Sequence, residues 1–206
     1  MTDIAEHAAG PRHRPRVEGD RVSQILDATV EVLAELGYDR LTMDAVAAAA
    51  KASKATLYRH WPTKAQLVVE AISRAKGGCP IPADIDTGSL RGDLIEMSCG
   101  DGGFTDELPM SVMAGLLTAL HRDTDLYDVF QRSFLAPRLE VVEEVYARAV
   151  ERGEITGDTD VELLSQTLPA VMIHRAFVLG IPPDNDFVVR VIDNLIMPAT
   201  HGSQRS

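Results

Sequence analysis

The chain has few cysteine and aromatic residues, and each shortage narrows the class of protein. Its two cysteines, Cys79 and Cys99, are too few for a disulfide framework, and neither has a partner at the Cys-x-x-Cys spacing of a zinc site. Cysteines of this kind fit a reducing cytoplasm. Aromatic residues make up only 5% of the chain, whereas alanine, leucine, valine and glutamate are plentiful. This balance favours an all-α fold over one with sheets.

Long hydrophobic runs are also missing from the sequence. No apolar stretch approaches ~18 residues, and Asp3 and Glu6 precede the first apolar block. We therefore expect neither a membrane span nor a signal peptide, and a cytoplasmic location. The 206 residues, 45% of them hydrophobic and 25% charged, suit one large globular domain or two small ones.

Charge is distributed unevenly along the chain. The net charge of −11 argues at first against a nucleic-acid partner, yet residues 1–76 hold 11 Lys and Arg against 10 Asp and Glu, while residues 77–206 hold 9 against 21. All four lysines lie in the first segment, at Lys51, Lys54, Lys64 and Lys76. Such asymmetry indicates a nucleic-acid-binding end and a different far end, although four lysines can also cluster by chance.

Helical periods divide the chain into three parts. Residues 1–18 have no apolar period and are predicted to form a flexible basic arm. Residues 19–76 carry four helical patterns, and residues 77–206 carry the others after a Pro- and Gly-rich stretch at 77–88. No window alternates as a strand does, so we predict about nine helices.

Local signals set the expected helix ends in residues 19–76. Gly37 closes the first helix. Thr42, Ser53 and Thr63 are predicted N-caps, the last with Gln66 at capping-box spacing. The expected buried faces of the second and third helices comprise Met43, Val46, Ala47, Ala50, Leu57 and Trp61.

Beyond residue 88 the apolar spacing predicts helices near 90–97, 105–120, 126–134, 139–149, 159–179 and 186–197. Thr105 is the expected cap of the second of these. Pro137 is predicted to separate two of the helices, and Pro169 to kink another. Thr159 and Glu162 have capping-box spacing at the start of that kinked helix.

The pattern of residues 42–60 is helix, tight turn and short helix. Because Leu57 and Trp61 bury one side of the second helix, its outer side presents basic, aromatic and hydroxyl groups. A narrow, well-packed helix with donors on its outer face is what reading of the DNA major groove requires. The outer side comprises Lys54, Thr56, Tyr58 and Arg59, with His60 at its edge and Lys51 and Lys64 flanking it. These residues alone leave a second interpretation open, a three-helix packing unit with a solvated basic face.

The run LTMDAVAAAAKASKATLYRHWPTKAQLV, which begins at residue 41, closely resembles the DNA-binding domain of the TetR family of bacterial transcriptional regulators. The resemblance rests on the helix start at Thr42, the turn ending at Ser53, the block Leu57–Trp61 and Thr63-Lys64, and it covers about residues 20–72. Many members have glycine where this chain has Lys51, which predicts mild strain if the backbone there is left-handed.

The resemblance implies a homodimer whose N-terminal domains bind a palindromic DNA operator and whose C-terminal domain binds a small effector. Carried over by position, the expected recognition helix contains Ser53, Lys54, Ala55, Thr56 and Tyr58, with Lys54 and Thr56 as base readers. The positions expected to touch phosphates are Thr42, Tyr58, His60 and Lys64, and Arg59 fits either role. The runs DTGSLRGDL, ARAVERGEI and DNDFVVRVID resemble a C-terminal subgroup of the family.

Two further sets of residues are predicted in the C-terminal part. An apolar or weakly polar effector is expected among Met113, Leu117, Phe130, Phe134, Met172 and Arg175. A strongly anionic effector is less expected because this part carries the acidic surplus. The homodimer interface is expected on the last two helices, at Leu168, Val188, Val191, Ile192 and Leu195.

Other function classes find less support. None of the six histidines has a glutamate three residues before it, as carboxylate-bridged metal enzymes require, and no Gly-x-Ser-x-Gly motif occurs. We therefore expect no enzyme, metal or cofactor. The alternative that stays open is a regulator of the same fold that binds a partner protein and has lost DNA binding.

Overall fold

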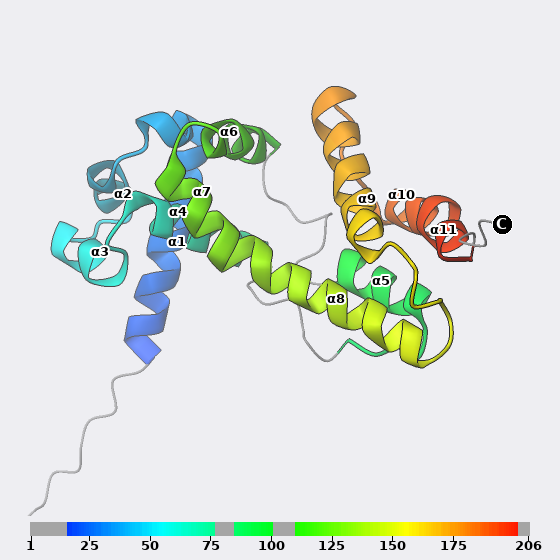
Figure 1. Ribbon diagram of the computed structural model, residues 1–206. Coiled ribbons are helices and arrows are strands. Elements are labelled where there is room, and N and C mark those ends of the chain that lie inside the picture. The colour runs from blue at the N-terminus through cyan, green and yellow to red at the C-terminus, as the bar shows by residue number, and fades with distance from the viewer. Residues whose placement is uncertain (1–15, 77–84, 101–109, 202–206) are drawn as a thin grey trace, which may run out of the picture.

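The computed structural model describes residues 16–76, 85–100 and 110–201. In these residues the chain forms nine continuous helical segments and no strand, which confirms the all-α prediction (Figure 1). The N-terminal helices are α1 (Arg16–Arg40), α2 (Met43–Ala49), α3 (Lys54–His60), α4 (Lys64–Ala75), α5 (Leu90–Cys99) and α6 (Met110–Leu120). The later elements are α7 (Thr124–Phe130), η1 (Gln131–Leu135), α8 (Ala136–Glu151), α9 (Val161–Ile173), η2 (His174–Val178), α10 (Asn185–Val191), η3 (Ile192–Ile196) and α11 (Met197–His201), where η marks a π-helical turn.

The three predicted N-caps of the first segment are confirmed. The Thr42 and Ser53 hydroxyls accept hydrogen bonds from the backbone N–H groups of Ala45 and Thr56. Thr63 makes both bonds of the capping box with Gln66. Each cap fixes where a short helix begins, so the angles between α2, α3 and α4 follow from local chemistry.

Two residues in this segment have a left-handed backbone. Gly37, at φ 72°, interrupts the helical backbone of α1 as predicted. Lys51, at φ 50°, is the one non-glycine residue with positive φ among the described residues. The left-handed backbone on which the expected strain depends is therefore present at this position, and the side chain of Arg21 donates to the Lys51 carbonyl.

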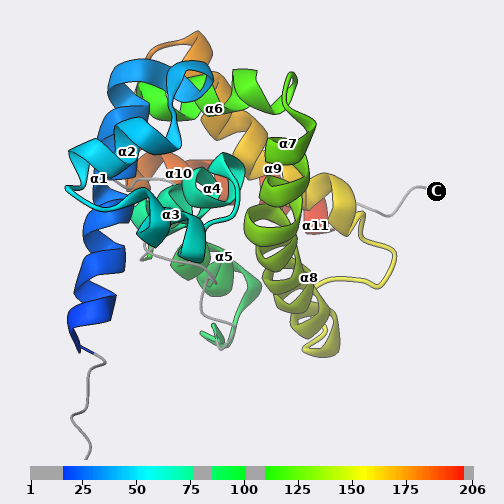
Figure 2. The same ribbon diagram turned by 90° about the vertical axis from the view of Figure 1, so that its left-hand side faces the viewer.

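A first hydrophobic core joins α1, α2, α3 and α4 with α6 and α7. Leu57, Leu67 and Ile72 are fully buried in it, and Leu116 of α6 and Leu126 of α7 are as well. Figure 2 shows α4 between α1 on one side and α7 on the other, in agreement with the contacts of α4 with both helices. The first core thus includes two helices that follow the predicted boundary at 77–88.

The expected break at Pro137 is wrong. The chain stays helical from Thr124 to Glu151, through α7, η1 and α8. Proline lacks the N–H that an α-helix needs. Directly before Pro137, the N–H of Ala136 donates to the carbonyl of Gln131 in a wider π-turn. This π-turn lets the helix continue although Pro137 cannot donate a hydrogen bond. Pro169 likewise lies inside α9, and the π-turn η2 follows that helix.

The predicted cap of α9 is displaced by one residue. The Asp160 carboxylate, and not the Thr159 hydroxyl, accepts from the N–H of Leu163. Thr159 is buried, and its hydroxyl has no hydrogen-bond partner among the described residues. The predicted cap Thr105 lies outside the described residues, as does most of the stretch 77–88.

A second hydrophobic core joins α5 with α8, α9 and the last helices. A polar cluster closes one side of it, around the fully buried carboxylate of Asp93. That carboxylate accepts from the Thr87 N–H at 2.6 Å, from the Thr87 hydroxyl at 2.8 Å and from the Arg152 guanidinium at 3.0 Å. Burial alone raises the pKa of Asp93, but these hydrogen bonds outweigh it and hold that pKa below its usual range.

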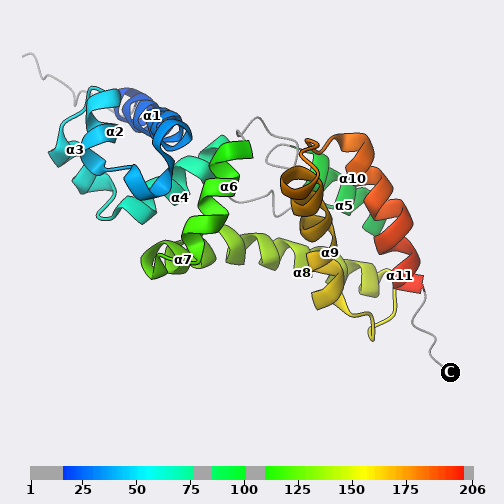
Figure 3. The ribbon, with the colours of Figure 1, turned by 90° about the horizontal axis from the view of Figure 1, so that it is seen from above.

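The two cores lie at opposite ends of the molecule, with α8 running from one towards the other (Figure 3). The short α2–α3 pair is at the free end of the first core. No helix of the described segments has the length and the apolar character that crossing a bilayer requires.

Candidate DNA-binding surface

The helix α3 is held from beneath by two buried side chains. Leu57 is fully buried, and Trp61, the C-cap of α3, is 2% exposed. The indole Nε1 of Trp61 donates to the Glu70 carboxylate of α4 at 2.7 Å. The helix is only seven residues long, so packing and this hydrogen bond must supply the rigidity that its own turns cannot.

The opposite side of α3 faces solvent, as the sequence pattern predicts. Lys54, Ala55, Tyr58, Arg59 and His60 are exposed, and 52% of the Tyr58 surface is accessible. The outer side of α3 therefore offers one ammonium, one guanidinium, one phenol and one imidazole on a rigid support. These are donors to phosphates and to base edges.

The hydroxyl groups near the start of α3 already have partners. The Ser53 and Thr56 hydroxyl oxygens lie 2.8 Å apart, and the Ser53 oxygen also accepts from the Thr56 N–H. Thr42 accepts from Ala45 in the same way at the start of α2. A hydroxyl that accepts a capping bond keeps its proton for donation, so Thr42 remains able to donate to an anion.

Lys54 pairs with an acidic residue that the sequence reading did not single out. Its Nζ lies 2.7 Å from the Asp44 carboxylate of α2, and both side chains are 62% exposed. The hydrogen bond and charge of Asp44 raise the pKa of Lys54. A ligand that binds Lys54 must therefore displace Asp44 or share Lys54 with it.

Lys64 links the surface to the rest of the molecule. Its Nζ donates to the Tyr38 carbonyl at 3.1 Å and lies 4.0 Å from the centre of the Tyr38 ring. The Tyr38 hydroxyl in turn donates to the Asp123 carboxylate, which caps α7. Burial, followed by the hydrogen bond and charge of Asp123, raises the pKa of Tyr38. Lys64 is thus partly engaged within the chain.

With this geometry in place, comparison with known proteins settles the family. A family model described as "Bacterial regulatory proteins, tetR family" matches residues 25–71, which span the surface and its support. A second, described as "Tetracyclin repressor-like, C-terminal domain", matches residues 84–195. The chain belongs to the TetR family. The predicted resemblance is confirmed for both halves of the sequence.

Similar TetR-family relatives cover nearly the whole chain. The uncharacterized HTH-type transcriptional regulator Rv1556 of Mycobacterium tuberculosis is 37% identical over 202 residues, which are 97% of this chain and 95% of the relative. The DNA-binding transcriptional repressor TetR of Mycobacteroides abscessus is 36% identical over 177 residues, 86% and 92% of the two chains. This TetR-family chain is accordingly a helix-turn-helix transcriptional regulator.

Solved structures support the same fold. The TetR family transcription regulator SCO0332 matches with a TM-score of 0.57 and 27% identity, over 86% of this chain and 97% of that one. A transcriptional regulator from Pseudomonas aeruginosa matches with a TM-score of 0.68 at 19% identity, over 93% and 94%. The second likeness concerns the fold alone.

The predicted effector residues are divided between the two hydrophobic cores, and α6 and η2, which carry three of them, are in contact. Met113, Phe130 and Phe134 pack against the first core, where the two phenylalanine rings stack at 4.8 Å between centroids. Met172 is buried in the second core. Arg175 pairs with Asp184 at 3.3 Å and lies over the Phe187 ring, and Leu117 is partly exposed on α6.

Four of the five residues predicted for the dimer interface are covered by their own chain. Leu168, Val188, Val191 and Ile192 are all less than 5% exposed and belong to the second core. Only Leu195, 48% exposed, is available to a second copy. The apolar spacing predicted that these segments are helical, but it did not show which of their side chains face outward. A core position and an interface position have the same sequence signature.

Proposed function

We propose that this TetR-family regulator is a repressor that binds a palindromic operator as a homodimer and is released by a small effector. The observation that carries the proposal is the outer side of α3, which is basic and exposed while Leu57 and Trp61 hold it from beneath. A relative described as a DNA-binding transcriptional repressor, 36% identical to this chain, supports the repressor role.

In this proposal Lys54 and Thr56 read bases, and the surrounding donors set the register on the DNA. Thr42, Tyr58, His60 and Lys64 contact phosphates, while Ser53 and Ala55 face the groove and Arg59 serves either purpose. Because Lys54 must leave Asp44 to reach a base, Asp44 opposes binding in general. Asp44 therefore favours those DNA sequences whose bases bind Lys54 strongly enough to offset the loss of the Lys54–Asp44 ion pair.

Homodimerisation is supported by apolar surface that the chain leaves uncovered beside the second core. Leu163 and Ile173 of α9 are 62% and 43% exposed. Val178 of η2 is 69% exposed, and Leu195 of η3 is 48% exposed. A two-fold dimer through this face places two α3 helices for the two half-sites of a palindrome.

Release by an effector requires a path from the second half to α3. The chain offers one at Tyr38, whose carbonyl and ring hold Lys64 and whose hydroxyl holds Asp123. A movement of α7 therefore acts on the start of α4, directly after the recognition helix. A tenfold loss of operator affinity needs ~1.4 kcal/mol of coupling between the two sites.

The DNA-binding part is tested with two charge variants that predict opposite results. The probe is a duplex that the purified protein enriches from a random-sequence pool, and affinity is measured by fluorescence anisotropy at several salt concentrations. Lys54→Gln is expected to weaken binding to the enriched duplex and to relax its preference for particular bases, because Lys54 reads a base in this proposal. Asp44→Asn is expected to strengthen binding by about twofold to fivefold, because it frees Lys54. Asp186→Asn, which removes the same charge from the exposed start of α10, is the control and should change neither.

Failure would be clear in this experiment. If no sequence is enriched and binding to DNA does not respond to salt, the DNA-binding proposal is wrong and the protein-interaction alternative is favoured. Sedimentation tests the dimer separately, since Leu163→Arg should give monomers while Glu143→Arg on α8 should not. A wild-type protein that sediments as a monomer at micromolar concentration contradicts the homodimer.

A further inference from the structure

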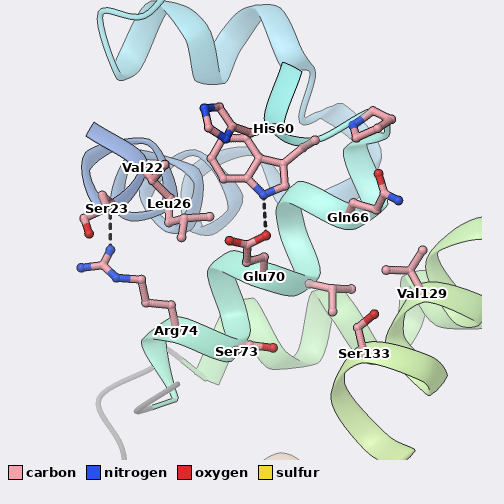
Figure 4. A pocket seen from close by; sticks show the side chains of 13 residues that line it. Val22, Ser23, Leu26, His60, Gln66, Glu70, Ser73, Arg74, Val129 and Ser133 are labelled. Atoms are coloured by element: carbon pink, nitrogen blue, oxygen red, sulfur yellow. Dashed lines mark hydrogen bonds between the residues drawn. The ribbon is translucent and has the colours of Figure 1, made fainter. Parts of the chain in front are cut away.

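A cleft of about 690 Å³ lies beside the end of α3, and its lining includes none of the residues predicted for the effector. Three parts of the chain line it. Val22, Ser23 and Leu26 come from α1, and Val129 and Ser133 come from α7 and η1. The rest of the lining comes from the end of α3 and from α4, namely His60, Trp61, Pro62, Gln66, Val69, Glu70, Ser73 and Arg74. Figure 4 shows these side chains around the open space.

The charges in the cleft do not cancel. Arg74 extends away from Glu70 towards α1, where it donates to the Ser23 carbonyl at 2.8 Å and to the Asp27 carboxylate at 2.7 Å (Figure 4). Glu70 accepts from Trp61 Nε1 and forms no ion pair with any of the described residues. The Glu70 carboxylate thus faces the cleft with a neutral hydrogen-bond donor as its partner, and a bound cation would form the ion pair that it lacks.

The remaining walls suit an organic group and not a hydrated metal ion. Val22, Leu26, Val69 and Val129 supply apolar surface on both sides of Glu70. No group of three or more potential metal ligands occurs among the described residues. Ser73 and Ser133, from α4 and η1, add hydroxyl groups that can accept from an ammonium. The lining therefore has one carboxylate without an ion pair, one guanidinium already paired with Asp27, a few acceptors and an apolar surround.

We propose that this cleft binds a small organic monocation, an amine with an aromatic or branched apolar body, whose ammonium pairs with Glu70. The site goes beyond the proposed function, because it lies against the end of the recognition helix and shares no residue with the predicted effector set. An occupant touches Trp61 at the end of α3 and Ser133 of η1 at once. It therefore fixes the recognition helix relative to the helix run that leads to the second core.

Three matched probes test the charge preference without DNA. Phenethylamine carries the cation, 2-phenylethanol is a neutral molecule of similar shape, and phenylacetate carries the opposite charge. Trp61 is the only tryptophan and lies in the wall, so its emission reports occupation directly. Calorimetry gives the dissociation constant independently. We expect phenethylamine to bind at least tenfold more tightly than 2-phenylethanol, and phenylacetate not to bind measurably.

Two variants locate the site. Glu70→Gln keeps an acceptor for Trp61 but removes the charge, so phenethylamine and 2-phenylethanol should then bind equally. Ser133→Phe, at an exposed position of η1, fills the cleft and should abolish binding of both. Glu143→Gln, which removes an exposed charge from α8, is the control and should leave all three probes unchanged.

The results separate this site from the proposed function. Equal binding of the three probes by the wild type, or an unchanged preference in Glu70→Gln, overturns the site. Because no DNA is present, neither result bears on operator binding. Conversely, a protein that enriches no DNA sequence but binds phenethylamine through Glu70 keeps the site and loses the repressor proposal.

Discussion

The two hydrophobic cores differ in how many apolar side chains they leave exposed to solvent. The first is closed by short, well-capped helices, and its one large exposed apolar side chain on the DNA-binding helices is Tyr58. The second is closed on one side by the polar cluster around Asp93, and it leaves Leu163, Val178 and Leu195 exposed. A core that is complete can present a fixed surface to DNA, whereas a core with uncovered apolar residues is suited to a partner.

The cores also divide the chain differently from the sequence boundary. Helices α6 and α7 follow the stretch 77–88, yet Leu116 and Leu126 are buried in the first core. The first core is therefore built from both sides of that stretch. A change in α6 or α7 should reach the DNA-binding helices directly, and this difference can be tested by weakening one core at a time.

The largest expected effect follows from truncating a buried leucine of α6. Leu116→Ala leaves a cavity in the first core and should cost about 2–5 kcal/mol of unfolding free energy. Urea unfolding followed by Trp61 emission reports this core, and far-UV circular dichroism reports the whole chain. We expect both midpoints to fall in Leu116→Ala.

Ile192→Ala makes the matching cavity in the second core, where Ile192 is fully buried. Here the circular dichroism midpoint should fall more than the Trp61 midpoint. If the two probes shift together in both variants, the cores unfold as one unit and the distinction between them is structural only.

A smaller effect is expected at Asp93, with a defined pH dependence. Its pKa in the folded chain is lowered, so its contribution to stability is present above the unfolded value of about 3.9 and is lost as pH falls through the folded value. Asp93→Asn should cost about 1–3 kcal/mol at pH 7, because the Arg152 and Thr87 donors lose a charged acceptor. Thermal unfolding from pH 7 down to pH 3 should then show a flatter profile for the variant than for the wild type. Equal slopes in the two profiles would contradict the assignment of this pH dependence to Asp93.

The smallest effect is expected at the turn between α2 and α3. Lys51→Gly relieves a left-handed backbone and should stabilise the first core by about 0.5–1 kcal/mol, after the greater chain entropy of unfolded glycine is subtracted. Lys51→Ala removes the same charge but keeps the strain and is the matched control. Thermal melts of the two variants measure the difference, and identical melting temperatures would show that the turn stores no strain.

Features decided by a few neighbouring residues could be predicted from the sequence. The caps at Thr42, Ser53 and Thr63 each involve a bond to a residue three positions on, and Lys51 stands at a turn whose geometry the family resemblance supplied. At α9 two neighbours, Thr159 and Asp160, both carry a capping oxygen. Because Thr159 is buried, Asp160 makes the capping bond instead. Burial depends on tertiary packing, which the local sequence does not show.

Contacts between distant residues could not be predicted in the same way. The Asp44 carboxylate that holds Lys54, the Tyr38 ring beneath Lys64 and the buried Asp93 carry no local signal of their partners. Val188 and Ile192 have the apolar spacing of an interface and are instead buried in the chain. The cleft at Glu70 was missed for the same reason, since its walls come from three separated segments.

The unbroken helix run from Thr124 to Glu151 makes the molecule a lever. At 1.5 Å per residue its 28 residues form a rod about 40 Å long. Asp123, at one end, is bonded to Tyr38, and Arg152, just past the other end, is bonded to Asp93. A tilt of roughly 5° about one end of such a rod displaces the other by about 3.5 Å, which is more than a hydrogen bond tolerates. The run stays helical through Pro137, so the two bonded ends belong to one continuous element.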